Sequence, residues 1–392
     1  MNIDLLDLNV QKFIEANLNT DINKLALTKN PFPGIVWSDI INQIAAKQKA
    51  KNKLPTWFAT KNIIYPSKLS IEQTSSEATA QYKANLIAGN SLIDLTGGFG
   101  IDDFYFAKQF KEVVHCELNA ELSKIVAQNA LVLNAENINC IAGDSTDILK
   151  KLNRKFDWIY VDPSRRNDLK GKVFMLKDCL PNVPELLDFY FEFSDSILIK
   201  NSPILDISLA ISELKNVKKV YIIALDNEVK EFLIEIKKDY SEKIILKTIN
   251  LSKNNNQVFE HIIEDDSSTS YSLPKQFVYE PNAAIMKSGL FNSVANQLNL
   301  FKLHQHSHIY TSDVLIENFP GRSFKVDHFF EFNKQNANQF LKGQKMNVTT
   351  RNFNLTVDEL KKKFKISDGG FIYTFATTTI NNQKTILICT KI

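Results

Sequence analysis

The chain has 392 residues, 44% of them hydrophobic and 23% charged, the composition of an ordinary globular protein with room for two or three domains. No apolar stretch reaches the roughly 18–20 residues of a membrane span, and the first residues show no secretory signal. Four cysteines lie far apart without a CxxC pair, so we expect no disulfide or zinc framework, a reducing cytoplasmic compartment and no membrane partner.

The net charge of +3 is spread unevenly along the chain. Residues 1–75 carry 9 Lys or Arg against 6 Asp or Glu, residues 76–270 carry 23 against 30, and residues 271–392 carry 15 against 8. Basic flanks around an acidic middle are compatible with an anionic partner such as RNA.

The N-terminal region contains no acid between Asp39 and Glu72, where six lysines are interleaved with Trp57 and Tyr65. Lysines beside exposed aromatic side chains suit a polyanion with stackable bases. The alternative is a solvated helix face followed by a loop.

The middle of the chain alternates short apolar runs with helical patterns. Runs that are apolar on both faces predict a mainly parallel sheet with helices on both sides, and ligands bind at the carboxyl ends of such strands. The capping box TSSE, with Thr74 as N-cap and Glu77 reaching back, predicts a helix before the first strand. The predicted strands are residues 91–95, 112–117, 138–143, 158–162, 196–200 and 220–225.

The first predicted strand ends in DLTGGFG, residues 94–100, where Gly97, Gly98 and Gly100 allow a tight turn and a close approach of a ligand. A phosphate-binding P-loop is excluded because its GK[ST] ending is missing. A dinucleotide fingerprint would need a glycine where Asp103 stands, and an aspartate is unfavourable beside a pyrophosphate. The pocket of S-adenosylmethionine, a ligand without phosphates, fits this turn.

Acidic residues follow three successive predicted strands. Asp94 opens the glycine turn and would face the cationic methionyl end of the cofactor. Glu117 stands 17 residues beyond Gly100, where it can accept from both ribose hydroxyls, and Asp144 can accept from the adenine amino group. Each acid alone could be a helix cap, but together they predict a site for S-adenosyl-L-methionine.

Four segments carry a family resemblance: LIDLTGGFGID, HCELNAELSKIVAQNA, AGDSTDIL and WIYVDPSRR resemble motifs I to IV of class I S-adenosylmethionine-dependent methyltransferases. Further segments, among them EPNAAIMKSGLFN, FPGRSF and RNFNLTVDELKKKFKI, are similar to a bacterial family with an N-terminal helical region, a class I methyltransferase domain and a C-terminal ferredoxin-like and THUMP-like region. The similarity covers nearly the whole chain but says little about the substrate.

The resemblance implies an α/β fold with a Rossmann-like class I methyltransferase sheet, an N-terminal helical region and a C-terminal α+β THUMP-like domain. The implied parts are residues 1–70 for the helical region, 71–270 for the methyltransferase domain, 271–323 for the ferredoxin-like module and 324–392 for the THUMP-like domain. The implied cofactor-binding residues are Asp94, Thr96, Gly97, Gly98, Phe99, Gly100, Glu117, Leu118, Asp144, Ser145 and Asp162.

The segment DPSRR after the fourth predicted strand supplies the candidate catalytic residues Asp162, Pro163 and Arg165. Enzymes that methylate amino groups of bases often carry Asp or Asn, two prolines and an aromatic residue here. The carboxylate and the first proline's carbonyl then accept from the target amino group. This chain has arginines in place of the aromatic residue, which suits an anionic substrate. The alternative is that Arg165 pairs with Asp144 or Asp168.

The C-terminal region offers weaker signals. His304, His306 and His308 would share one side of a strand, but no other ligand type stands nearby, so we predict a polar strand edge and no metal. Thr356 is expected to cap a helix that ends in KKKFK, either an anion-binding end or a solvated face. Residues 369–380 and 384–392 predict a hairpin.

Two functions remain open at this stage, with a cofactor-binding protein that has lost catalysis as a weaker third. The first is an S-adenosylmethionine-dependent methyltransferase acting on an RNA base, with an exocyclic amino group favoured. The second is a methyltransferase acting on a small molecule or a protein, with the basic flanks serving as a lid or a dimer interface. The sequence leaves the oligomeric state open.

Overall fold

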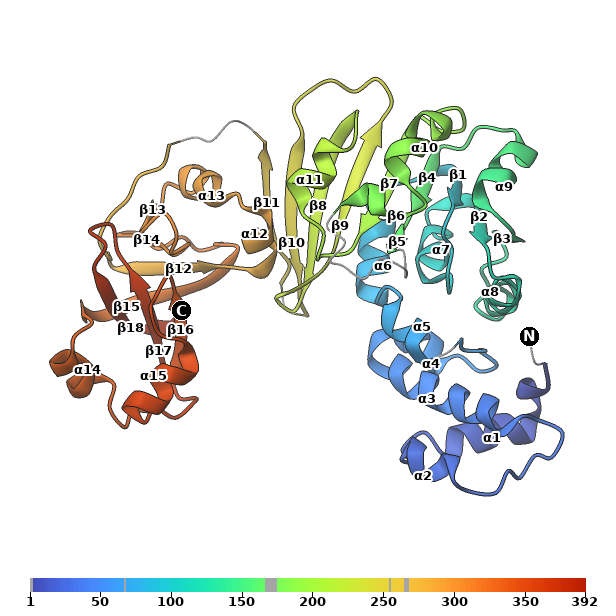
Figure 1. Ribbon diagram of the computed structural model, residues 1–392, viewed down its shortest axis with the longest axis horizontal. Helices are drawn as coiled ribbons and strands as arrows, with labels where there is room; N and C mark the ends of the chain where they lie inside the picture. The colour runs from blue at the N-terminus through green and yellow to red at the C-terminus, as the bar shows by residue number, and fades with distance from the viewer. Residues whose placement is uncertain (1–2, 67, 166–174, 254, 264–267) are drawn as a thin grey trace. The chain divides into compact units, whose positions relative to one another are not determined.

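The computed structural model describes residues 3–66, 68–165, 175–253, 255–263 and 268–392 (Figure 1). The chain forms two compact units, residues 1–219 with 230–242, and residues 220–229 with 243–392. Among the described residues, no helix combines the length and apolar character needed to cross a membrane.

The first unit begins with short helices that pack around their own core, in which Val10, Ile14, Ile40 and Ile44 are buried. Asp7 and Asp21 cap two of these helices by accepting from backbone N–H groups. The elements are η1 (Ile3–Leu6), α1 (Leu8–Ala16), α2 (Ile22–Ala26), α3 (Trp37–Lys53), α4 (Pro55–Ala59) and α5 (Lys68–Gln73).

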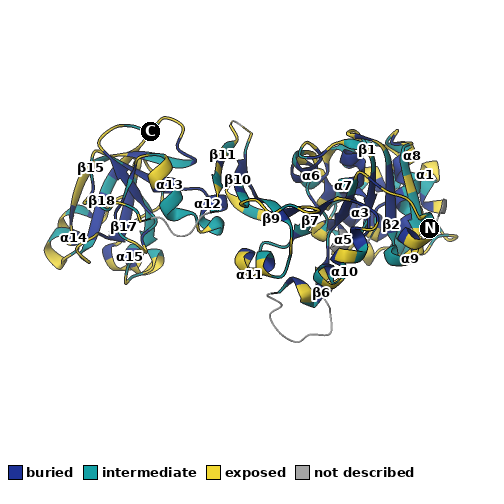
Figure 2. Ribbon diagram, turned by 90° about the horizontal axis from the view of Figure 1, so that it is seen from above, coloured by how far each residue is buried: buried dark blue, intermediate teal, exposed yellow. Residues whose placement is uncertain are grey.

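The rest of the first unit is built on a mainly parallel sheet, as predicted. Its strand order is β9-β7-β4-β1-β2-β3, with the last five strands of this order parallel and β9 antiparallel to β7. The central strands are largely buried because most of their inner residues are apolar (Figure 2). The strands are β1 (Gly89–Asp94), β2 (Phe110–Glu117), β3 (Ile138–Ala142), β4 (Trp158–Val161), β7 (Ser196–Asn201) and β9 (Glu228–Lys237).

Helix α6 (Glu77–Ala84) precedes β1. The helices that follow β1 are α7 (Ile101–Phe106), α8 (Ala120–Val132), α9 (Ser145–Leu152), α10 (Val183–Tyr190) and α11 (Ile207–Ser212). Near the end of β4 lie the small antiparallel pair β5 (Ser164–Arg165) and β6 (Cys179–Leu180), and the 3-10 turn η2 (Leu176–Asp178). Strand β8 (Val217–Leu225) follows α11.

The predicted capping box before β1 is wrong. Ser76, not Thr74, caps α6 by accepting from the backbone N–H of Thr79. The Glu77 carboxylate accepts instead from the Thr56 N–H at 2.6 Å and from the Tyr105 hydroxyl at 2.8 Å. Donors far away in the sequence therefore replaced the local backbone donor on which the prediction relied.

The second unit contains the antiparallel pair β10 (Ile245–Leu251) and β11 (Gln257–Ile262), and a seven-stranded sheet of order β13-β14-β12-β15-β18-β17-β16. The strands of this sheet are β12 (Phe277–Pro281), β13 (Phe301–Lys302), β14 (Tyr310–Ser312), β15 (Gly321–Glu331), β16 (Asn347–Arg351), β17 (Ile372–Thr378) and β18 (Lys384–Lys391). Its helices are α12 (Ala283–Ser288), α13 (Phe291–Gln297), α14 (Lys334–Phe340) and α15 (Val357–Phe364).

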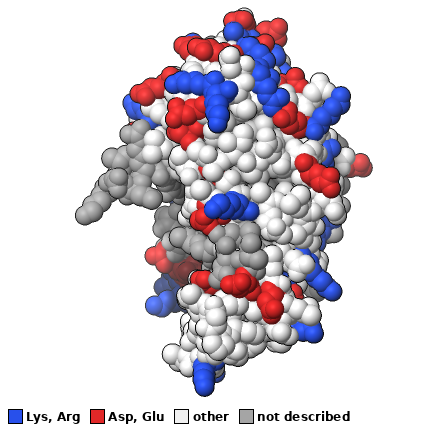
Figure 3. Space-filling model, turned by 90° about the vertical axis from the view of Figure 1, so that its right-hand side faces the viewer, with Lys and Arg blue, Asp and Glu red and all other residues white. Residues whose placement is uncertain are grey.

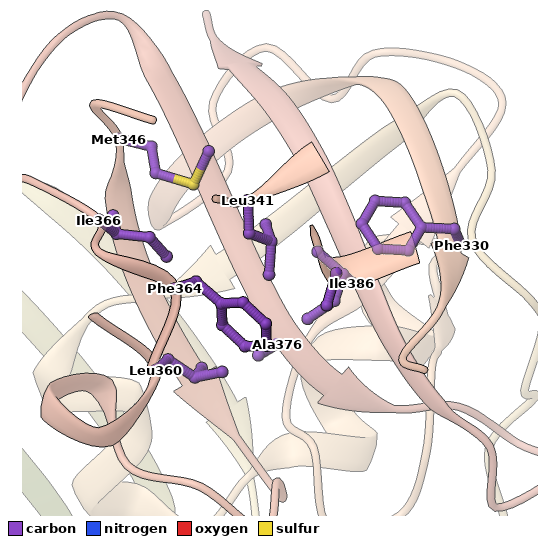
Figure 4. Packing of buried hydrophobic residues seen from close by; sticks show 9 residues of the cluster. Phe330, Leu341, Met346, Leu360, Phe364, Ile366, Ala376 and Ile386 are labelled. Carbon is purple, nitrogen blue, oxygen red and sulfur yellow. The ribbon is translucent and has the colours of Figure 1, made fainter. Parts of the chain in front are cut away.

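Local sequence signals in this unit mostly hold. β17 and β18 form the predicted terminal hairpin, and Thr356 caps α15 in a complete capping box. Leu341 from the end of α14, Leu360 and Phe364 from α15 and Ile386 from β18 meet in one apolar core (Figure 4). The strand predicted for residues 304–308 is wrong, because these residues form a turn in which His308 stacks on Phe291.

Candidate functional site

The glycine turn after β1 requires glycine for steric reasons. Gly98 and Gly100 adopt left-handed φ angles of 55° and 71°, which residues with a side chain rarely accept. A Cβ atom on Gly97 would stand 2.1 Å from Nδ1 of His115, so the turn lies directly on the imidazole ring of β2. The tightness of this turn is thus fixed by packing beneath it as well as by its own backbone.

Hydrogen bonds join the end of β1 to the end of β4. Asp94 is 2% exposed. Its carboxylate accepts from the Thr96 N–H at 2.7 Å and from the Thr96 hydroxyl at 3.1 Å. The Thr96 hydroxyl oxygen in turn accepts from the Asp162 N–H at 2.7 Å. The structure therefore brings together Asp94, Thr96 and Asp162 from the predicted set.

Glu117 at the end of β2 is held against the glycine turn. One carboxylate oxygen accepts from the Gly98 N–H at 3.0 Å and the other from the Asn119 N–H at 2.8 Å. A carboxylate offers about four acceptor positions, so these two bonds leave room for hydroxyl donors of a ligand. Its position beside the turn is that expected of a ribose-binding acid.

Asp144 at the end of β3 is a helix cap. Its Oδ1 accepts from the N–H groups of Thr146 at 2.9 Å and Asp147 at 3.2 Å, the alternative that a single acid after a strand always leaves open. The Gly143 N–H donates to the Glu117 carbonyl at 3.0 Å, so the ends of β2 and β3 are adjacent. Both bonds to Asp144 use Oδ1.

Of the remaining residues implied by the resemblance, Leu118 is 74% exposed and Ser145 is the first residue of α9. Phe99 is buried, with its ring centroid 6.2 Å from that of Tyr65. Pro163 is buried directly after Asp162. The backbone of Arg165 belongs to β5, but its side chain and residues 166–174 lie outside the described part of the chain, so the two alternatives for this arginine both stand.

A buried ionisable cluster underlies the turn. Nδ1 of His115 lies 2.6 Å from the Asp103 carboxylate, and both side chains are fully buried. Burial, and after it the Asp103 carboxylate, raises the pKa of Asp94 well above normal. Burial, and after it the Asp102 carboxylate, raises the pKa of Asp103 in the same way. Burial lowers the pKa of His115 despite the acids beside it.

A second buried network, which was not predicted from the sequence, involves Lys83. Lys83 is fully buried, with its Nζ 3.1 Å from the Asp102 carboxylate and 2.9 Å from the Glu231 carboxylate. The Tyr160 hydroxyl from β4 donates to Asp102 at 2.8 Å. No local pattern marks these residues, because their partners come from α6, α7, β4 and β9.

Lys200 at the end of β7 was also missed. Its ammonium group pairs with the Asp162 carboxylate, and its side chain is 12% exposed. Burial alone would lower the pKa of Lys200, but the carboxylates of Asp162, Glu231 and Asp102 outweigh it and raise that pKa, so this lysine stays charged. A lysine that ends a buried strand, as in SILIK, could have signalled this position as the acids did.

The prediction that the aromatic residues of the N-terminal region are exposed is wrong. Trp57 is 1% exposed and packs edge-on against Phe104, and Tyr65 is 3% exposed. The lysines of this region differ in exposure: Lys47 is buried and pairs with Glu15, whereas Lys61 is exposed. On the face seen in Figure 3, basic and acidic side chains are interspersed around broad uncharged areas.

The strand order of the first unit and the site at its carboxyl edge define the class I methyltransferase fold. Family models match the second unit: a ferredoxin-like domain over residues 277–320 and a THUMP domain-like model over residues 321–391. A search among curated proteins found no match.

Among solved structures, the chain resembles a proposed methyltransferase from Porphyromonas gingivalis W83, with 30% sequence identity, 98% of each chain covered and a TM-score of 0.87. A tRNA m1G37 methyltransferase from M. jannaschii matches 43% of this chain and 51% of its own, with 12% identity and a TM-score of 0.31. Trm5b from Pyrococcus abyssi matches 42% and 49%, with 17% identity and a TM-score of 0.30. The sequence identities and TM-scores of the last two structures are too low to say anything about the substrate of this chain.

The first of these likenesses extends over both units and nearly the full length of each chain. The protein therefore belongs to the bacterial family of class I methyltransferases with an N-terminal helical region and C-terminal ferredoxin-like and THUMP-like domains.

Proposed function

We propose that the protein is a cytoplasmic, S-adenosyl-L-methionine-dependent methyltransferase that acts on an RNA base, at an exocyclic amino group. The observation that carries the cofactor assignment is the Glu117 carboxylate, held by the Gly98 N–H against a turn that only glycine can form. Glu117 would accept from the ribose hydroxyls with the acceptor positions that its two backbone hydrogen bonds leave open.

The bound cofactor would supply an electrophilic methyl group on a sulfonium. The residues of this chain would position the acceptor: the Asp162 carboxylate and the Pro163 carbonyl would accept from the target amino group and direct its lone pair toward the methyl carbon. Lys200 would orient the Asp162 carboxylate through their ion pair, and the Thr96 hydroxyl would fix the Asp162 backbone. Arg165 would contact an anionic part of the substrate.

RNA is favoured as the substrate by the THUMP domain-like region, whose name implies kinship with an RNA-binding module, and by its basic charge. In this proposal the parts of the chain are the helical region 1–70, the methyltransferase domain 71–270, the ferredoxin-like module 271–323 and the THUMP-like domain 324–392. The THUMP-like domain would bind the RNA backbone. The burial of Trp57 and Tyr65 supports the second candidate, a methyltransferase of small molecules or proteins, because it removes two stacking groups from the N-terminal flank.

Two measurements test these proposals. Calorimetry should show binding of S-adenosylmethionine or its demethylated product with micromolar affinity, about −8 kcal/mol. Tight binding of NAD instead would reject the cofactor assignment. Mass spectrometry of nucleosides from total RNA of cells with and without the gene should reveal one methylated nucleoside that depends on it, and identical RNA would favour the second candidate.

A further inference from the structure

Three of the segments that carry the family resemblance meet at one carboxylate of the second unit. Glu280 opens EPNAAIMKSGLFN, Arg322 lies in FPGRSF, and Arg351 opens RNFNLTVDELKKKFKI. The Glu280 carboxylate accepts from Nε of Arg322 at 2.9 Å and also from its Nη2, and it accepts from Nη2 of Arg351 at 3.0 Å. Because Glu280 is 6% exposed, one buried carboxylate holds two guanidinium groups, both from the THUMP-like region.

The contact between Arg351 and this carboxylate depends on the curvature of the seven-stranded sheet. Strand β16, which ends with Arg351, lies four positions from β12 in the strand order, a separation of about 19 Å in a flat sheet. A turn of the ferredoxin-like module docks beside the same strand end. The amide nitrogen of Asn352 lies 3.1 Å from Nδ1 of His304, and the Ser307 hydroxyl donates to the Thr378 carbonyl at 2.7 Å. The fold of the unit therefore fixes the position of this guanidinium group.

The cluster carries more positive charge than the ion pairs require. Two guanidinium groups share one carboxylate, and neither arginine pairs with a second acid anywhere in the described ranges. The potential is felt at His308 in the same turn. Burial first, and then the charges of Lys302, Arg351 and His306, lowers the pKa of His308 to about 4. The surplus charge at the end of β16 is thus positive.

Both arginines keep hydrogen-bond donors that their carboxylate does not use. A guanidinium group has five N–H donors. Nη1 of Arg322 donates to no described residue, and Nε of Arg351 is buried without a partner among them. The two side chains are 41% and 33% exposed, so solvent reaches them. Planar forks that are already oriented and still partly accessible match the oxygen atoms of a phosphate group.

A pair in the first unit shows what an ordinary ion pair of this kind needs. Arg154 donates to both carboxylate oxygens of Glu112, at 2.8 Å and 2.6 Å, and its side chain is also 41% exposed. One guanidinium is enough to neutralise that carboxylate. At Glu280 the second guanidinium exceeds this requirement, which favours a ligand over a simple link between strands.

We propose that Arg322 and Arg351, oriented by Glu280, bind a phosphate group of the RNA backbone. This inference rests on the proposed function, and it adds the residues of the second unit that hold the RNA. Contacts to phosphate carry no sequence information, so these arginines position the RNA and leave the choice of base to other residues.

The first experiment measures binding of a fluorescein-labelled single-stranded RNA dodecamer to the full chain, by anisotropy between about 50 and 200 mM salt. We expect Arg322→Gln and Arg351→Gln each to weaken binding about tenfold and to reduce the salt slope by about 0.7. Arg154→Gln removes a guanidinium group of equal exposure and should bind like the parent.

Glu280→Gln distinguishes a phosphate site from a purely structural link. It breaks the same ion pairs as the two arginine variants, so all three should lower the melting temperature by similar amounts. Because both guanidinium groups remain, Glu280→Gln should keep the salt slope of the parent. A slope that falls equally in all three variants, or in none of them, would overturn the proposal.

A second ligand identifies the source of the phosphate. Calorimetry with 5′-AMP should show weaker binding than the dodecamer shows, with little dependence on either arginine. If AMP binds as tightly as the dodecamer and loses as much affinity in Arg322→Gln and Arg351→Gln, the site serves a free nucleotide and the assignment to RNA is wrong.

The same variants separate this inference from the proposed function. Their affinity for S-adenosylmethionine should equal that of the parent. If the arginine variants bind the dodecamer like the parent while cellular RNA still shows a methylated nucleoside that depends on the gene, the phosphate site is disproved and the proposed function stands. Identical nucleosides with and without the gene count against the proposed function instead.

Discussion

The glycine turn and the N-terminal helices belong to the same unit but bury opposite kinds of side chain. Beneath the turn the buried groups are ionisable: Asp94, Asp103 and His115 are all at most 2% exposed. Among the helices the large buried side chains are apolar, with Ile40 and Ile44 at 0% and Trp57 at 1%. Burying charge costs free energy unless it is paired, whereas burying an aromatic ring stabilises the fold.

This difference indicates which property a substitution should change in each region. Changes among the helices should mainly lower the free energy of unfolding, because their buried groups contribute through packing. Changes at the strand ends around the turn should mainly affect ligand binding and turnover. The following predictions test that division, from the largest expected effect to the smallest.

Trp57→Ala should destabilise the first unit by about 3–5 kcal/mol, the usual range for removing a buried tryptophan, measured by urea unfolding. The control Leu27→Ala removes a side chain that is 89% exposed and should change stability by less than about 0.5 kcal/mol. If Trp57→Ala unfolds like the parent but loses RNA binding, the residue is a stacking platform and the comparison of the two regions is mistaken.

Asp162→Ala should lower turnover by about two orders of magnitude, about 2.7 kcal/mol, and leave cofactor affinity within a few-fold. It also leaves the ammonium of Lys200 without its carboxylate, so some loss of stability is expected. Asp157→Ala is the matched control at the opposite end of β4, where Asp157 accepts from the N–H groups of Asn90 and Ser91. That control should cost stability and spare turnover on the RNA that nucleoside analysis identifies. Full turnover in Asp162→Ala would show that this residue only caps a strand.

Glu117→Ala should weaken S-adenosylmethionine binding more than tenfold, above about 1.4 kcal/mol, because two ribose hydroxyls lose a charged acceptor. Glu121→Ala, on the exposed side of the next helix where Glu121 pairs with Lys124, should bind like the parent. Calorimetry on both variants decides it, and equal affinities would remove Glu117 from the cofactor site.

The pH dependence of stability should reveal Lys53, with an effect below about 1 kcal/mol because the side chain is partly solvated. Its folded pKa of about 8 lies below the unfolded value near 10.5, so the unfolded chain binds the extra proton between these values. The contribution of Lys53 to stability should therefore rise as the pH increases from 8 to 10.5. The difference between the parent and Lys53→Met in urea unfolding at pH 7.5 and 9.5 measures it. A difference that does not change with pH would mean that Lys53 titrates normally.

Much of the fold could be predicted from the sequence because its signals are local. Apolar runs predicted the strands β1, β2, β3, β4, β7 and β8, the glycine turn was recognised from its composition, and the capping box of Thr356 is complete. Strand β9, which was not predicted, pairs antiparallel with β7. Asp226 and Asn227, which both have positive φ in the turn directly before β9, were the local signal for this strand.

The sequence by itself determined the positions at which the backbone is constrained. Gly98 and Gly100 are left-handed, and an acid or a lysine at the end of a buried strand has to reach the sheet's carboxyl edge. Only the tertiary structure decided which side chains meet there. Glu77 accepts a hydrogen bond from Thr56, which is 21 residues away. Asp162 pairs with Lys200, which is 38 residues away. Trp57 packs against Phe104. Backbone sterics act within a few residues and can be read locally, whereas ion pairing and burial depend on neighbours that the folded chain alone brings together.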